Sequence, residues 1–167
     1  MSLPVAAVGA VVAALLELSI VPYLRIGGAQ PDLVLVLAIT WTILIGIEGG
    51  LAWAFLGGLV IDILAPRPLG STAFVLLVCV GVAALLGRVL EPVRVAAPIM
   101  TTFVVAILYA VLFLIVYGAL HSPIAVPDPA TAVLPRAIYD ALLAALIGFI
   151  AVWWLGRRTT ERKRANW

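Results

Sequence analysis

The chain has 167 residues, of which 65% are hydrophobic and 11% are charged, and its mean hydropathy is +1.26. Soluble domains are about half apolar and about a quarter charged, so this composition argues against a soluble globular protein. It also excludes intrinsic disorder, which requires low hydrophobicity and high net charge. The formal net charge is only +2, but five of the ten basic residues lie in the last eleven positions. These values indicate a membrane protein with a basic tail.

Apolar runs alternate with short polar segments that are rich in proline and glycine, and about 20 apolar residues are enough to cross a bilayer. The runs are apolar on all sides and lack the alternation of a barrel strand, so they predict helices. No Lys or Arg precedes the first run, which is therefore interpreted as a retained helix and not a cleaved signal. We expect an all-α integral membrane protein, a six-transmembrane-helix bundle over residues 1–156 followed by a basic tail over 157–167. The expected spans are residues 3–24, 32–47, 51–65, 71–87, 95–120 and 136–155.

Two of the connections are distinctive. Residues 46–50, Gly-Ile-Glu-Gly-Gly, predict a very short turn, so the second and third helices should pack antiparallel. Residues 122–135 hold four prolines and form the longest expected loop.

The basic residues orient the bundle. Six spans place both termini on one side, which then holds seven basic residues against three on the other. The positive-inside rule therefore predicts that both termini are cytoplasmic. The basic tail is expected to contact anionic lipid, and nucleic acid is not expected as its partner. Its basic residues are Arg157, Arg158, Arg162, Lys163 and Arg164.

With this orientation, charged residues gather in the outer third of the bundle. One interpretation is that they cap helix ends and extend towards the interface, and Asp32 is well placed as an N-terminal cap. The other is that they form an outer polar cluster that contacts a partner, because ionisable groups near lipid usually face the bundle interior or a partner. The residues concerned are Glu17, Arg25, Asp32, Asp62, Arg67, Arg136 and Asp140.

Small residues recur on two of the expected helices. Gly50, Ala54 and Gly58 are four residues apart on the third helix, and Asp62 continues the series. Small residues let helices approach closely, so we expect internal packing there, with Asp62 hydrogen-bonded inside the bundle. The first helix has a similar stripe at Ala6, Ala10 and Ala14, for which both internal packing and partner docking are open.

The sequence lacks recognisable catalytic, cofactor-binding and metal-binding motifs. One histidine, His121, and one cysteine, Cys79, do not suffice for a zinc site of the usual kind. No nucleophile motif, phosphate-binding loop or dinucleotide fingerprint occurs in the sequence. We therefore expect no enzyme activity, no cofactor and no metal.

The stretch from residue 31 to residue 70 resembles the family of the bacterial rod shape-determining protein MreD. It combines Pro-Asp-Leu at 31–33, the glycine-rich turn at 46–50, a glycine-rich run that ends in Gly-Leu-x-x-Asp at residue 62, and Pro-Leu-Gly at 68–70. Glu48 departs from the family, which often has a basic residue in that turn. The residues that carry the resemblance are Pro31, Asp32, Gly46, Gly50, Gly57, Gly58, Asp62 and Gly70.

The resemblance implies a non-enzymatic scaffold in the bacterial cytoplasmic membrane that belongs to the cell-elongation machinery and supports regulation of peptidoglycan synthesis. It implies binding to MreC, through its transmembrane helix and juxtamembrane outer segment. MreC would connect the protein indirectly to RodA, a class B penicillin-binding protein and MreB. It also implies a fold similar to the substrate-binding subunits of energy-coupling-factor transporters, so the alternative function is that of a vitamin-binding subunit with an outward pocket.

Overall fold

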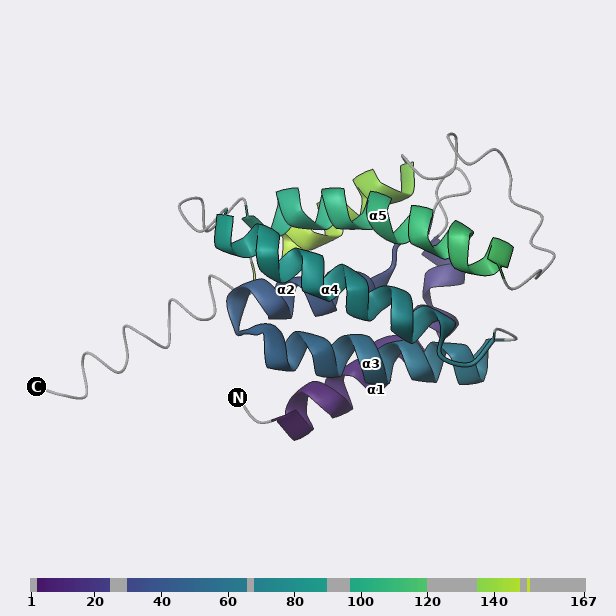
Figure 1. Ribbon diagram of the computed structural model, residues 1–167. Coiled ribbons are helices and arrows are strands. Elements are labelled where there is room, and N and C mark those ends of the chain that lie inside the picture. The colour runs from purple at the N-terminus through teal and green to yellow at the C-terminus, as the bar shows by residue number, and fades with distance from the viewer. Residues whose placement is uncertain are drawn as a thin grey trace, which may run out of the picture.

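The computed structural model describes residues 3–24, 30–65, 68–89, 97–119, 135–147 and 150, and every regular element among them is helical. Residues 135–147 are also helical and are called the last helical segment below. Figure 1 shows the helices running roughly side by side along one direction. The labelled elements are α1 (Leu3–Ser19), the 3-10 helix η1 (Val21–Leu24), α2 (Leu33–Leu44), α3 (Ile47–Leu64), α4 (Ser71–Val89) and α5 (Ala97–Ala119).

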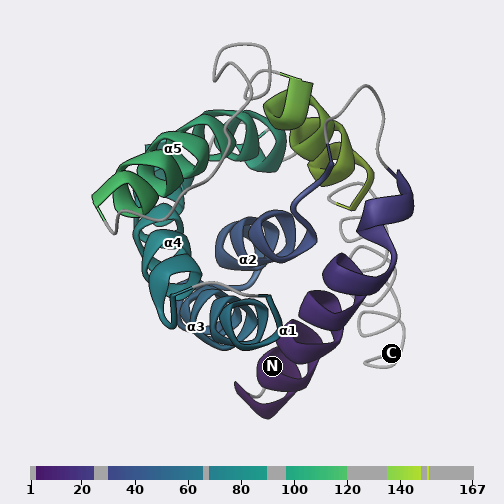
Figure 2. The same ribbon diagram turned by 90° about the vertical axis from the view of Figure 1, so that its right-hand side faces the viewer.

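The helices form a ring around α2. Viewed along the bundle in Figure 2, α1, α3, α4, α5 and the last helical segment surround this short central helix. The side chains of α2 are correspondingly buried, and Val36, Ala38 and Ile39 are 0% exposed. The hydrophobic core therefore follows α2, with one face of each surrounding helix packed against it.

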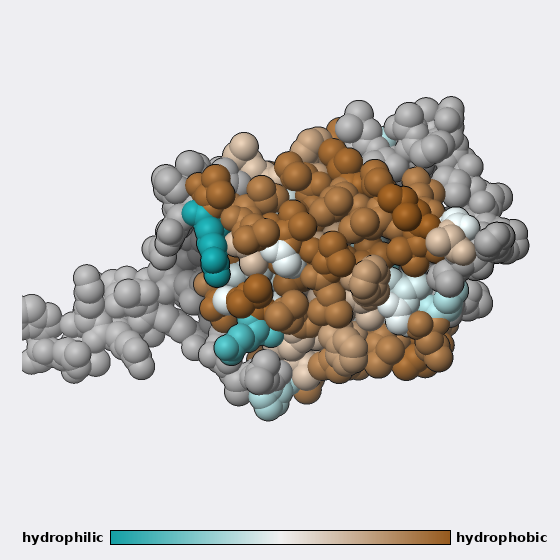
Figure 3. All heavy atoms as spheres, viewed as in Figure 1, coloured by the Kyte–Doolittle hydropathy of each residue, from teal (hydrophilic) through white to brown (hydrophobic). Residues whose placement is uncertain are grey.

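The outer surface of the helix bundle is apolar, as expected for a surface that faces lipid. Within the part of the chain that the structure describes, four stretches are long and apolar enough to cross a membrane, and α2, with 12 residues, is shorter. The face seen in Figure 3 is almost continuously hydrophobic across α3, α4 and α5. The prediction of an all-α multi-pass membrane protein is therefore confirmed, while the similarity to transporter subunits stays a prediction. The four stretches are Pro4–Tyr23, Ile47–Leu64, Ser71–Val89 and Ile99–Val116.

Two boundaries differ from those expected. The predicted short turn is present but does not extend over residues 46–50, because α2 ends at Leu44 and α3 already begins at Ile47. Gly46 has a φ of 143°, which is accessible to glycine, so this one residue reverses the chain. The first expected span also changes character, since α1 ends at Ser19 and continues as η1. Pro22 lies inside η1 and has no N–H for an α-helical hydrogen bond, which accounts for this change.

Candidate functional site

The beginning of α2 is surrounded by charged side chains from two other elements. The first N–H groups of any helix lack partners within that helix. Here Glu17 of α1 accepts a hydrogen bond from the Val34 N–H, at 2.8 Å from Oε2. Asp140 of the last helical segment accepts one from the Asp32 N–H, at 2.7 Å from Oδ1. Two carboxylates from the surrounding ring therefore cap the central helix.

Asp32 itself is paired with Arg136. The expectation that the Asp32 side chain caps α2 is wrong, because it occupies the N-cap position but makes no hydrogen bond to the helix. Instead, Arg136 donates to both carboxylate oxygens, in the two-pronged geometry that makes arginine–carboxylate pairs strong. Arg136 and Asp140 are four residues apart on one helix face, so both reach the same end of α2. We call Glu17, Asp32, Arg136 and Asp140 the polar cluster.

The polar cluster is rich in acid. It holds three carboxylates and one guanidinium group. Asp32 is 5% exposed and Asp140 is 1% exposed, so both are removed from solvent. Asp140 Oδ2 has no hydrogen-bond partner among the described residues. The cluster thus joins α1, α2 and the last helical segment and leaves one buried carboxyl oxygen unpaired.

Asp62 caps a different helix, α4. It is 2% exposed and lies in the last turns of α3, where it accepts hydrogen bonds from the first N–H groups of α4. Its Oδ2 lies 3.0 Å from the Thr72 nitrogen and 3.5 Å from the Ala73 nitrogen. Gly70, with a φ of 86°, allows the chain to turn into α4 just before these amides. Asp62 therefore caps α4 from α3 and is not part of the polar cluster.

The small residues of α3 lie inside the bundle, where the glycines face α2 and α4. A Cβ atom on Gly50 would lie 1.8 Å from Thr42 Oγ1 of α2, and one on Gly57 would lie 2.6 Å from Val34 Cγ1. One on Gly58 would lie 2.5 Å from the Ala73 Cα atom of α4. Ala54 is 0% exposed.

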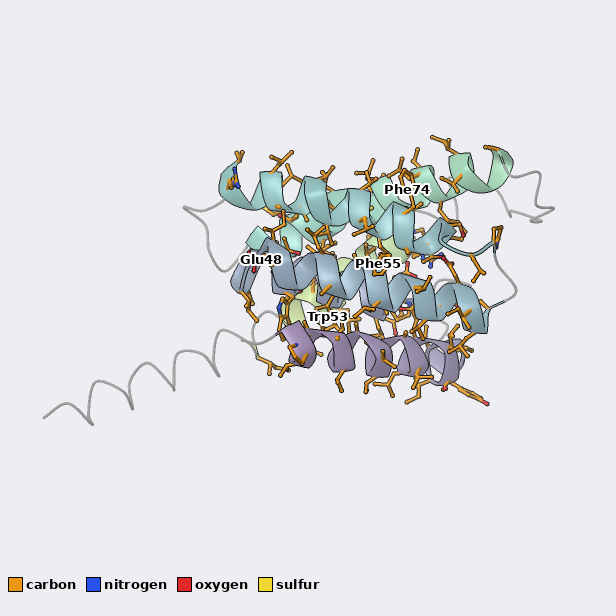
Figure 4. The ribbon with its side chains drawn as sticks, turned by 60° about the horizontal axis from the view of Figure 1, so that its bottom comes forward. Glu48, Trp53, Phe55 and Phe74 are labelled. Atoms are coloured by element: carbon orange, nitrogen blue, oxygen red, sulfur yellow. The ribbon has the colours of Figure 1, made fainter. Side chains whose placement is uncertain are left out.

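On the α1 side, Gly9 lies against Trp53, and Figure 4 shows this ring between α3 and α1. The alanine stripe of α1 is buried too, at 0–1% exposure for Ala6, Ala10 and Ala14. This stripe packs internally, and it is therefore not available to dock a partner.

The remaining sequence candidates are placed as follows. Pro31 is buried beside the polar cluster residue Asp32. Cys79 is a buried thiol of α4. No group of three or more metal-ligating side chains occurs in the part of the chain that the structure describes. The candidates outside the described residues are Arg25, Arg67, Arg157, Arg158, Arg162, Lys163 and Arg164.

Sequence reasoning identified the acidic residues but missed their partners. Val34, Thr72 and Ala73 take part through backbone N–H groups, and a backbone group leaves no mark in the sequence. The tilted contact between the rings of Trp41 and Trp53, with centroids 5.6 Å apart, was also not expected. Both residues belong to adjoining helices, but only the reversal at Gly46 places their rings together.

The comparisons with known proteins gave one result. A family model described as rod shape-determining protein MreD matches residues 4–156, a range that contains the whole polar cluster and every described helical residue except Leu3. No curated protein and no solved structure matches the chain.

Proposed function

Because the chain belongs to the MreD family of rod shape-determining proteins, we propose that it is a non-enzymatic scaffold of the bacterial cell-elongation machinery. In this proposal it lies in the cytoplasmic membrane with both termini in the cytoplasm. It binds MreC and, through MreC, supports regulation of peptidoglycan synthesis by RodA and a class B penicillin-binding protein. MreB filaments are reached by the same indirect route.

The contacts of the charged side chains inside the bundle support a scaffold function. Glu17 and Asp140 bind backbone N–H groups at the start of α2, and Asp32 binds Arg136. Asp62 binds backbone N–H groups of α4. Each of these groups connects one helix to another, so together they stabilise a rigid arrangement of the helices. A rigid bundle with an apolar exterior presents surfaces on which other membrane helices can pack.

The vitamin-binding alternative is not favoured. It requires a pocket between the helices, lined by the outer acids and arginines. In the structure α2 occupies the centre of the ring (Figure 2). Most of its side chains are buried against the surrounding helices. The acids that would contact a vitamin instead bind Arg136 or backbone N–H groups.

The face formed by α3 and α4 is the surface that we assign to MreC. Phe55 of α3 is 50% exposed and Phe74 of α4 is 59% exposed, and Figure 4 shows both on these neighbouring helices. Gly58 and Ala73, which bring the two helices into contact, are close to these rings in the sequence. Aromatic side chains are enriched where proteins meet. We assign this face to the transmembrane helix of MreC, with its juxtamembrane outer segment beside the α3–α4 turn.

The experiment that tests the function is affinity capture of the full chain from detergent-solubilised membranes of its own host, read by mass spectrometry. Recovery of MreC together with elongation synthases is the expected result. Recovery of two ATPases and a large membrane coupling subunit, without MreC, would overturn the proposal in favour of vitamin uptake. A preparation from the same membranes without the tagged chain is the control.

A further inference from the structure

The Asp140 carboxyl group has one satisfied oxygen and one unsatisfied oxygen. Oδ1 accepts the Asp32 N–H at 2.7 Å, which directs the carboxyl group into the polar cluster. Oδ2 has no partner among the described residues, although Asp140 is only 1% exposed. A buried carboxylate with an unpaired oxygen is costly in any protein interior and in a membrane, and proteins commonly relieve that cost by neutralising the group.

The neighbours of Asp140 do not supply the missing positive charge. Asp32 at the N-cap of α2 and Glu17 on α1 are acids that face it, so they disfavour a further negative charge. Arg136, on the same helix, is the one cation of the cluster. It attracts Asp140 as well, but its hydrogen bonds go to both oxygens of Asp32. Tyr109 on α5 faces Arg136 and carries no positive charge. An ionised Asp140 would therefore have no cation of its own within the polar cluster.

We infer that Asp140 is a proton-binding site, and that the bound proton allows the last helical segment to close on the beginning of α2. A hydrated proton from the bulk solvent forms an O–H bond at Oδ2 and leaves a water molecule, while Oδ1 keeps its hydrogen bond to the Asp32 N–H. No electron transfer or further reactant is involved. A metal ion is a poorer match, since the described part of the chain contains no group of three metal-ligating side chains.

Loss of this proton has a structural consequence. It leaves an ionised carboxylate beside Asp32 and Glu17, with the guanidinium already occupied. Repulsion then acts between the last helical segment and both α1 and α2, which weakens the contact that the polar cluster makes. The packing of this segment thus depends on pH. This inference goes beyond the scaffold function and does not rely on it.

The first test is thermal unfolding of the purified full chain in detergent, from about pH 5 to about pH 9. At about pH 5 and above the native state holds a proton that the unfolded chain has already released, because an unperturbed Asp ionises at about pH 4. The Tm of the wild type should therefore fall as pH rises, until native Asp140 also ionises. Asp140→Asn replaces the neutral acid with a neutral amide. Its Tm should match that of the wild type at the acidic end, within about 2 °C, and should not fall as the pH rises.

Asp32→Asn is the matched control, because it removes an ionised carboxylate from the same cluster. It should lower the Tm by more than about 6 °C at every pH, since Arg136 loses its partner. If Asp140→Asn behaves like this control across the whole pH range, Asp140 is ionised in the native state and the inference is overturned.

Infrared spectroscopy gives a second readout, and its wild-type spectrum alone can overturn the inference. At neutral pH the exposed acids are ionised, so a neutral carboxylic acid C=O band in the wild type reports a buried protonated group. We expect this band in the wild type and its loss in Asp140→Asn. A wild-type spectrum without the band at neutral pH would overturn the inference. Because both measurements use the isolated protein, their failure is distinct from a failure to recover MreC.

Discussion

Gly58 of α3 lies directly against the backbone of Ala73 in α4. A Cβ atom on Gly58 would be 2.5 Å from the Ala73 Cα atom and 2.7 Å from its nitrogen. This contact brings the first amides of α4 within reach of Asp62, which lies one turn further along α3 and binds the Thr72 N–H. Close packing and capping of α4 are therefore parts of one arrangement.

Gly58→Ala should destabilise the protein. The added methyl group meets backbone atoms, which cannot rotate away, so α3 and α4 must move apart at a cost of about 1–3 kcal/mol. Gly81→Ala is the matched control within α4, because nothing lies within 4 Å of its added Cβ atom. It should be neutral or stabilise by up to about 1 kcal/mol. Thermal unfolding in detergent measures both, and equal Tm values would contradict the close contact.

Asp62→Leu should cost about 1–3 kcal/mol in unfolding free energy. It removes the carboxylate that accepts hydrogen bonds from the buried N–H groups of Thr72 and Ala73. Asp62→Asn should cost less, because an amide oxygen can still accept from Thr72. The measurement is the detergent unfolding midpoint of both variants beside the wild type. A leucine variant as stable as the wild type would show that the cap contributes nothing.

The sequence predicted helices and the gathering of charges, but it could not predict which helix is central. Val8 is 65% exposed and Val34 is 1% exposed, although the two side chains are identical. In a membrane both lipid and protein interior are apolar, so hydropathy does not distinguish the two environments. Side-chain size carries more information, because Ala6, Ala10 and Ala14 of the small-residue stripe all lie inside.

The partners of the acids were predictable to different degrees. Asp62 and Thr72 are ten residues apart on adjoining helices, so their proximity follows from the short connection at Gly70. Asp140 and the Asp32 N–H are 108 residues apart, and their contact requires the closed ring. Only the complete set of helix contacts determines such a pair.

The ion pair of Asp32 and Arg136 should show strong coupling in a double-mutant cycle. Arg136→Leu leaves the buried Asp32 carboxylate unpaired, and we expect a loss of about 2–4 kcal/mol, reduced by the one-third exposure of the arginine side chain. The double variant with Asp32→Leu should lose less than the sum of the two single changes, because no charge is stranded. Additive losses in detergent unfolding would contradict a direct pair.

The proposed orientation can be tested by labelling single cysteines in intact cells. Cys79 is buried, so it should give little background with a thiol reagent that does not cross membranes. Leu69→Cys, in the exposed turn between α3 and α4, should be labelled from outside. Glu48→Cys, at the opposite end of α3, should be labelled only after permeabilisation. The reverse pattern would place the termini outside.

Phe55→Ala and Phe74→Ala should reduce recovery of MreC in the affinity capture. If the α3–α4 face binds the partner helix, removing either ring costs at least about 1.4 kcal/mol, a tenfold weakening. The matched controls are Val8→Ala on α1 and Leu142→Ala on the last helical segment, which are 65% and 64% exposed and lie on other faces. All four variants should unfold at similar temperatures, because each shortens a side chain that is at least half exposed. Loss of MreC with a control variant, and not with either phenylalanine variant, would move the docking surface to that control's face.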